Sequence, residues 1–242
     1  MLNRIVRIGT WSSLCLVTAL ACAQAPNNGR RPARAEHPPI LRPGLFFEED
    51  WKPSAKREQP LTGQSSDNPD LDVVTYVPAG QIVLAGSVSI KSKPNLASEA
   101  VLHAWTGLCT SPCAVALRDK RYFANLSGLA LISMKTTMSG FHHVRPIVKL
   151  ADGTWWVGDQ ATGATGGGWL TSQISYADLR WLKLDMKRLV TVGNLVDKID
   201  LTKVDEIGFV DLKPSSGHGY GGFASVAQLK VYARAVPRTG QD

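Results

Sequence analysis

From residue 71 onward, the chain is a succession of short apolar segments, each bounded by glycine, proline, asparagine or aspartate. Short runs rich in valine, isoleucine and aromatic residues are typical of β-strands, and the bounding residue types favour turns. No segment sustains the 3.6-residue apolar period of a long helix. The pattern predicts an all-β, jelly-roll-type β-sandwich with little helix, apart from one turn near residues 176–179. The expected strands cover residues 71–77, 82–90, 101–107, 114–118, 129–136, 143–150, 154–159, 179–186, 205–212 and 227–232.

Residues 141–160, FHHVRPIVKLADGTWWVGDQ, predict a β-hairpin. Asp152-Gly153 is a strong two-residue turn signal, because both turn positions need a positive φ. With this turn, Lys149 pairs with Trp156, and paired residues share a face. The face expected in the core carries Val148, Leu150, Trp155 and Val157, and the other face carries Arg145, Lys149, Trp156 and Gln160. A slip of one residue would exchange the two faces.

The second face has the composition of a ligand-binding surface. Aromatic rings stack on the apolar faces of sugar rings, while charged and amide side chains bond the hydroxyls. Trp181 is added because alternation along residues 180–186 places Leu182 and Leu184 inward. The expected ligand-binding residues are Arg145, Lys149, Trp156, Asp159, Gln160, Trp181 and His218. The alternatives are core packing for the two tryptophans, and a salt bridge from Arg145 to Asp159 or Asp211.

Residues 1–23 have the pattern of a secretory signal peptide, with Arg4 and Arg7 before an apolar run that ends in small residues. That run is shorter than the roughly 20 residues of a membrane span, and no further long apolar segment follows. Cleavage after Ala23 predicts a secreted or periplasmic protein. A lipoprotein anchored through Cys22 is the alternative.

Three further divisions follow the signal peptide. Residues 24–43 are rich in proline and arginine and predict a flexible linker. Residues 44–236 form the expected β-sandwich domain, and residues 237–242 form a C-terminal tail.

Cys109 and Cys113 lie in the sequence CTSPC. In an oxidising compartment this short loop predicts a disulfide. A thioredoxin-type pair has two intervening residues rather than three, and zinc needs further ligands nearby, so we expect no metal site.

The formal net charge is +7, of which Arg4 and Arg7 contribute two. The basic residues are scattered, and no predicted helix could enter a nucleic-acid groove, so we expect no nucleic-acid partner. A mildly basic surface favours acidic glycans or anionic envelopes instead.

The chain resembles a family of secreted bacterial proteins in four segments: LFFEEDWK, RPIVKLADGTWWVGDQ, DLRWLKLD and VDEIGFVDLKPSSGHGYGGFASVAQLKVYA. Members of that family are mostly uncharacterised and are similar to galactose-binding-like sandwiches that occur as carbohydrate-binding modules. The resemblance covers residues 44–235 and implies a β-sandwich, but the family does not specify an activity. The expected partner is a polysaccharide or cell-envelope glycan. Similar modules often hold a structural calcium. Here Glu48, Glu49 and Asp50 are the candidate ligands, but Ser225 stands where another acidic residue would be expected.

Noncatalytic carbohydrate binding is therefore the predicted function. An enzymatic alternative is a lyase, in which Arg145 and Gln160 neutralise a uronate while His143 or Tyr220 serves as base and acid. A glycoside hydrolase would instead need two paired carboxylates, and the spacing of the acidic residues pairs none of them. The third interpretation is a structural envelope protein whose aromatic residues pack against a partner.

Overall fold

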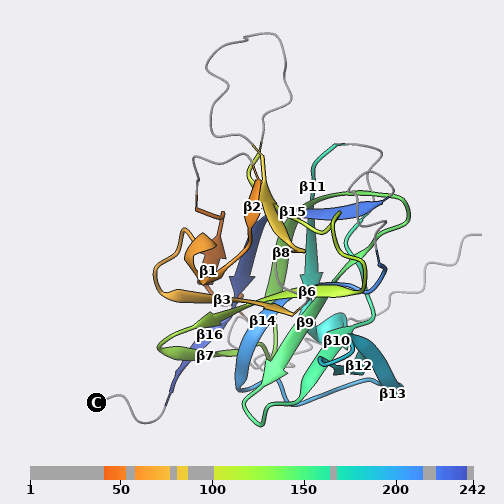
Figure 1. Ribbon diagram of the computed structural model, residues 1–242. Coiled ribbons are helices and arrows are strands. Elements are labelled where there is room, and N and C mark those ends of the chain that lie inside the picture. The colour runs from red at the N-terminus through yellow and green to blue at the C-terminus, as the bar shows by residue number, and fades with distance from the viewer. Residues whose placement is uncertain are drawn as a thin grey trace, which may run out of the picture. The chain divides into compact units, whose positions relative to one another are not determined.

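Two antiparallel sheets pack against each other in the computed structural model of the chain (Figure 1). The structure describes residues 41–52, 58–76, 81–86, 101–163, 168–214 and 222–238, all within the unit Ile40–Asp242. The predicted signal peptide, Cys22 and His218 lie outside these residues, as do most of the predicted linker and tail. The described part of the chain is an all-β, jelly-roll-type sandwich, as the sequence predicts. It includes no helix long and apolar enough to cross a membrane.

The first sheet has seven strands in the order β11-β8-β15-β5-β4-β2, and β1 also pairs with β15. These strands are β1 (Leu45–Glu49), β2 (Glu58–Pro60), β4 (Val83–Ala85), β5 (His103–Trp105), β8 (Leu131–Ser139), β11 (Leu170–Ser175) and β15 (Phe223–Tyr232). The long β15 pairs with β8 along one edge, and with β5 and then β1 along the other. The N-terminal strand is thereby tied to the end of the domain.

The second sheet has nine strands in the order β13-β12-β10-β9-β14-β6-β3, with β7 on β14 and β16 on β7. These strands are β3 (Leu71–Tyr76), β6 (Cys113–Asp119), β7 (Tyr122–Asn125), β9 (Val144–Leu150), β10 (Trp155–Gly158), β12 (Trp181–Asp185), β13 (Val190–Val196), β14 (Val204–Asp211) and β16 (Arg234–Pro237). Two single turns of 3₁₀-helix, η1 (Gly63–Ser65) and η2 (Tyr176–Asp178), complete the described elements. The turn η2 lies where the sequence predicts one.

The main core lies between the two sheets and is built from alternate residues of their strands. On β15, Leu229 and Val231 are fully buried, as alternation predicts. The segment before Lys52 docks through Trp51, whose indole is 1% exposed and donates a hydrogen bond to the Val226 carbonyl at 2.8 Å. The inward apolar faces of the two sheets are therefore buried against each other.

A smaller apolar cluster covers the outer face of the nine-stranded sheet. Its buried members all come from that sheet and its hairpins: Ala114, Ala116, Ile147, Trp155, Val157, Leu184, Leu189 and Val210. Several strands of this sheet are consequently apolar on both faces.

The predicted register of the β9–β10 hairpin is wrong by one residue. Trp155 pairs with Lys149, and Trp156 pairs with Val148. Arg145 and Lys149 remain on the outer face, but Trp155 joins them there. Trp156 turns inward, where it packs half-buried against the main core. The two tryptophans have exchanged the faces assigned to them.

The length of the turn explains the slip. The Leu150 N–H donates to the Thr154 carbonyl, and the Gly153 N–H donates to the Leu150 carbonyl, both at 2.9 Å. The loop therefore holds three residues, with Gly153 at φ 86°. In such hairpins a type I turn is followed by one left-handed glycine. Asp152-Gly153 locates the turn correctly, but only Gly153 takes the positive φ.

The predicted orientation of Trp181 is also wrong. Its side chain is 1% exposed in the main core and stacks on Tyr176, with the ring planes 4° apart. Leu182 and Leu184 instead face the outer cluster. Alternation along β12 separates two faces, but each carries a buried apolar side chain, Trp181 on one and Leu184 on the other, so it does not say which face is inside.

Gly208 provides a test of the packing between β14 and β6. A Cβ at this position would lie 1.9 Å from the Val115 carbonyl oxygen, which is backbone and has little room to move. We expect Gly208→Ala to lower the free energy of unfolding by about 1–3 kcal/mol, measured by urea denaturation. Gly44→Ala is the control, because a Cβ there meets nothing within 4 Å. Equal stability of the two variants would contradict this packing.

Candidate functional site

Most side chains of the predicted site are engaged in internal contacts. Arg145 donates from Nε to the Gly158 carbonyl at 2.7 Å, and burial lowers the pKa of its guanidinium. The Gln160 amide donates to the Asp178 carbonyl at 3.1 Å. Within the described residues, Arg145 forms neither of the salt bridges considered for it. Asp159 pairs with Arg180, and Asp211 binds His142.

Asp159 binds Arg180 through both carboxylate oxygens, at 3.0 Å from the backbone nitrogen and 2.9 Å from Nε. Burial would raise the pKa of Asp159, but these two hydrogen bonds outweigh it and lower the pKa. Trp156 and Trp181 face inward. The structure therefore does not gather the predicted residues into one open groove.

Lys149 belongs to a polar network on the outer face of the nine-stranded sheet. Its ammonium lies 2.6 Å from one oxygen of the buried Glu206, whose other oxygen accepts a 2.8 Å hydrogen bond from the Tyr76 hydroxyl. Trp155 packs edge-on against Tyr76, with ring centroids 5.1 Å apart. Burial, together with the neighbouring Glu206 carboxylate, raises the pKa of Tyr76. This network fixes Trp155 in place, at only 8% exposure.

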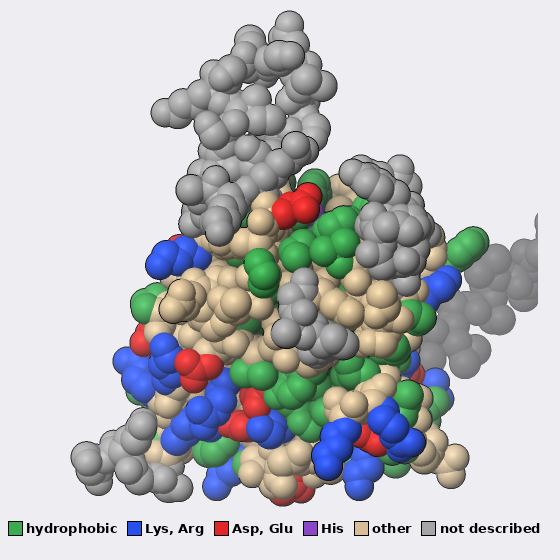
Figure 2. All heavy atoms as spheres, viewed as in Figure 1, with side chains coloured by type: hydrophobic (Ala, Val, Ile, Leu, Met, Phe, Trp, Pro, Cys, Tyr) green, Lys and Arg blue, Asp and Glu red, His purple; other side chains and the backbone are tan. Residues whose placement is uncertain are grey.

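Asp205 extends the same network. It accepts hydrogen bonds from Arg118 at 3.0 Å and from Arg238, and lies 3.4 Å from the Lys149 ammonium. In Figure 2, hydrophobic side chains gather in the lower middle of the molecule, and charged side chains lie on both flanks. A hollow of about 560 Å³ lies beside Tyr76, Met186 and Leu189.

A second group of aromatic side chains lies on the outer face of the seven-stranded sheet. We call it the aromatic face, defined as His103, Trp105, Lys135, Trp169 and Phe223. Trp105 and Phe223 meet edge to face with centroids 6.1 Å apart, and His103 meets Trp169 in the same way at 5.3 Å. The Lys135 ammonium lies 6.0 Å from the centre of the Trp169 ring. All five side chains are half-buried.

Strand pairing places these residues on one face. Trp105 pairs with Ser225 on β15, and Phe223 lies two residues earlier on the same strand. Their neighbours Ala104 and Ala224 are fully buried in the main core, so the aromatic rings point outward. Alternating residues on paired strands make this arrangement a property of the sheet.

Glycine and histidine shape the aromatic face further. A Cβ at Gly107 would lie 2.4 Å from the Trp105 ring, so only glycine lets the indole lie against the backbone there. His103 donates from Nδ1 to the Val101 carbonyl at 2.7 Å, and burial lowers the pKa of His103. The contact with Gly107 and the hydrogen bond to Val101 hold the Trp105 and His103 rings in fixed positions.

Sequence reasoning missed the aromatic face, although part of its pattern was visible. His103 and Trp105 are two residues apart in a predicted strand, so they share a side. Trp169 follows a glycine-rich segment and precedes β11, where no strand is predicted. Its place above Lys135 and beside His103 is set by tertiary structure alone.

The acidic residues proposed for calcium do not fit a metal site. Glu48 binds Lys230 at 2.8 Å and the Gln228 amide at 2.9 Å, and that amide also donates to Asp50. Glu49 is buried and accepts hydrogen bonds from protein donors. Among the described residues, no three His, Cys, Asp or Glu side chains are grouped so as to hold a metal ion.

The predicted disulfide between Cys109 and Cys113 is absent from the structure. Both are free thiols, and both are fully buried. Cys109 donates to the Gln81 carbonyl at 3.7 Å. The pKa of the Cys113 thiol is raised. The neighbouring Cys109 thiol is the largest cause, and burial is the second. The short CTSPC loop brings the two thiols together, but they form no disulfide in the structure.

No protein-family model and no curated protein matches the chain. Among solved structures, it is similar to a family 11 carbohydrate-binding module from Clostridium thermocellum in complex with a β-1,3-1,4-mixed-linked tetrasaccharide. The identity is 16% and the TM-score 0.41, over 74% of this chain and 98% of that one. The family 11 module of the cellulosomal cellulase Lic26A-Cel5E of Clostridium thermocellum is 13% identical, with a TM-score of 0.40, over 80% and 97% of the two chains.

PfGH50B is 10% identical, with a TM-score of 0.39 over 75% of this chain, which spans only 24% of PfGH50B. At such low TM-scores, the fold and the function assigned to this chain rest on its own geometry.

The Asp205 network predicts acid sensitivity. Burial would raise the pKa of Asp205, but hydrogen bonds from Arg238 and Arg118 outweigh it and lower the pKa. The stability it contributes is present above the unfolded-state value of about 4 and is lost as pH falls through the folded-state value. We expect Asp205→Asn to cost about 1–3 kcal/mol at pH 7 and to weaken the loss of stability below about pH 4, measured by thermal unfolding.

Asp197→Asn is the control for this experiment, because Asp197 is exposed and forms none of the ion pairs found among the described residues. An Asp205→Asn variant with the acid dependence of the wild type would contradict the assignment.

Proposed function

We propose that the chain is a noncatalytic carbohydrate-binding domain, and that its aromatic face takes up a polysaccharide. The observation that carries the proposal is the gathering of four aromatic rings on one sheet face, from β5, β15 and the segment before β11. Aromatic rings bury the apolar faces of sugar rings while leaving the sugar hydroxyls free to form hydrogen bonds.

The rigidity of the aromatic face supports this proposal. Three of the rings belong to strand residues, His103, Trp105 and Phe223, and the first two are each fixed by a backbone contact. A surface that needs little reordering loses less conformational entropy when it binds.

Polar side chains around the rings could bond the sugar hydroxyls. Thr171 and Gln173 are exposed on β11 and pair with Lys135 and Ser133 on β8, so they lie on the same side of the sheet as the aromatic rings. A threonine hydroxyl, a glutamine amide and a lysine ammonium together offer both donors and acceptors. This mixture suits a hydroxyl-rich polymer.

The noncatalytic form of the proposal is supported by the positions of the residues expected in a lyase. Arg145 and Gln160, which would neutralise the uronate, each donate to a backbone carbonyl instead.

The compartment is part of the same proposal. We propose that residues 1–23 direct export and that the mature protein is secreted or periplasmic, with a lipid anchor at Cys22 as the alternative. A glycan partner outside the cytoplasm is consistent with that location.

Affinity gel electrophoresis against a panel of neutral and acidic polysaccharides tests the proposed binding. We expect at least one polysaccharide to retard the wild-type protein. Trp105→Ala and Trp169→Ala should each weaken retardation about tenfold, since losing one stacked ring costs on the order of 1 kcal/mol.

Tyr122→Ala is the matched control, because Tyr122 is a half-buried aromatic residue on β7 of the other sheet. It should be retarded like the wild type. The proposal fails if no polysaccharide retards the wild type, or if both tryptophan variants bind normally. A rise in absorbance near 235 nm on acidic polysaccharide would instead indicate a lyase, as expected of the unsaturated product of β-elimination.

A further inference from the structure

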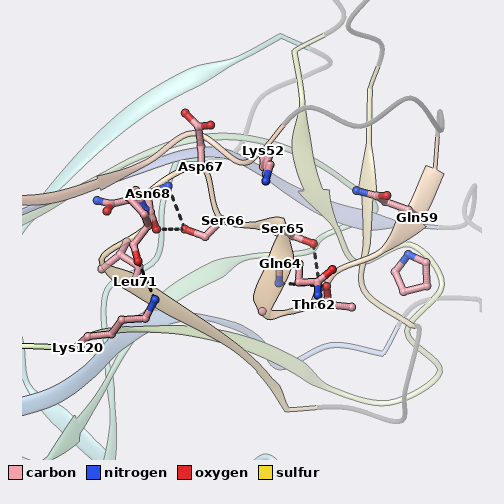
Figure 3. A pocket seen from close by; sticks show the side chains of 13 residues that line it. Lys52, Gln59, Thr62, Gln64, Ser65, Ser66, Asp67, Asn68, Leu71 and Lys120 are labelled. Carbon is pink, nitrogen blue, oxygen red and sulfur yellow. Dashed lines mark hydrogen bonds between the residues drawn. The ribbon is translucent and has the colours of Figure 1, made fainter.

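A polar hollow lies beside the turn η1 (Figure 3), and none of its described lining residues belongs to the aromatic face. Its volume is about 690 Å³, which is within the range of small-molecule sites. Its lining includes the polar side chains of Lys52, Thr62, Gln64, Asp67, Asn68 and Lys120. No aromatic residue is among the described residues that line it.

A buried carboxylate fixes one wall of the polar hollow. Glu49 is 0% exposed, and one of its oxygens accepts hydrogen bonds from the Trp51 N–H at 2.8 Å and the Asp67 N–H at 2.9 Å. Its other oxygen accepts a hydrogen bond from the Ser66 hydroxyl. The chain at Ser66 and Asp67 is therefore held to the end of β1 and to the core.

The turn η1 fixes the adjoining part of the wall. The Thr62 hydroxyl accepts from the Gln64 N–H at 3.3 Å, and the Thr62 N–H donates to the Ser65 hydroxyl at 3.0 Å. The Lys52 N–H donates to the Ser65 carbonyl at 2.8 Å, which ties this turn to the segment after β1. The hollow is preformed, and a ligand would need little rearrangement.

Two lysines give the polar hollow a positive bias. In Figure 3, Lys52 and Lys120 approach the Thr62–Asn68 loop from opposite sides. Lys120 donates to the Pro69 carbonyl at 2.7 Å and lies 3.7 Å from Asp72. Lys52 forms none of the ion pairs found among the described residues, so its ammonium is available to an anion.

The remaining groups select among anions. Gln64 offers an amide, Thr62 a hydroxyl, and the Asp67 carboxylate can accept hydrogen bonds from hydroxyls. The Asn68 amide is already bound to the Glu48 carbonyl and the Asp70 N–H, so it shapes the wall of the hollow. That carboxylate would repel a phosphate dianion more strongly than a singly charged carboxylate. A nucleotide base would find no ring on which to stack among the described lining residues. The groups present match a ligand with one carboxylate and several hydroxyls.

We propose that the polar hollow is a binding site for a sugar acid, with the uronate carboxylate against Lys52 and the sugar hydroxyls against Gln64 and Asp67. The site is independent of the aromatic face and does not rest on the function proposed for that face. It would give the domain affinity for acidic units, whether free or within a glycan.

Ligand-observed NMR and calorimetry with D-galacturonate and D-glucuronate test the proposal, with D-galactose and D-glucose as uncharged counterparts. We expect at least one sugar acid to bind about tenfold more tightly than its neutral counterpart, and added salt to weaken its binding. Lys52→Gln should remove this preference, and Lys52→Arg should keep part of it. Lys183→Gln, an exposed lysine on β12, is the control and should bind like the wild type.

Two further measurements distinguish the polar hollow from binding at the aromatic face and from a general anion site. Trp105→Ala should leave sugar-acid binding unchanged, because the aromatic face is not involved; a loss would move the ligand there and overturn the proposal. Inorganic phosphate should compete poorly, and full displacement by phosphate would indicate a general anion site instead. Equal binding of acidic and neutral sugars, or no binding of either acid, would also overturn it.

Discussion

The pairing of β15 with three other strands holds both the core and the aromatic face in place. Nine of its ten residues pair with β8 along one edge, and the strand pairs with β5 and β1 along the other. Inward residues such as Ala224 and Leu229 fill the space between the sheets, while Phe223 points outward beside Trp105. One strand therefore determines where the first segment of the domain docks and which rings share a surface.

The sequence predicted the fold class well because it depends on coarse properties. Short apolar segments and frequent turn residues indicate a sandwich whatever the exact pairing. The β9–β10 hairpin was located from Asp152-Gly153, but its register depends on whether the loop has two residues or three. That choice is decided by hydrogen bonds of Leu150 and Thr154, which no local pattern specifies, and it exchanged Trp155 with Trp156.

The candidate site was less predictable, because both faces of the nine-stranded sheet are apolar. On β12, Trp181 is in the main core and Leu184 is in the outer cluster, so alternation could not identify the solvent side. The aromatic face was missed for a different reason, because Trp169 reaches it from outside any predicted strand. The polar hollow was also missed, because it is made by loop backbone that is held through Glu49. Such long-range contacts leave little trace in local sequence.

The edge strand β13 has a consequence for solubility. It pairs only with β12 among the described strands, and it exposes Val190, Val192 and Leu195. A flat apolar edge of this kind is a template on which another chain can add a strand. Gly193, at φ 79° within the strand, and the shift in register against β12 interrupt that template. The irregularity separates the exposed residues into short pieces, and so guards the domain against edge-to-edge association.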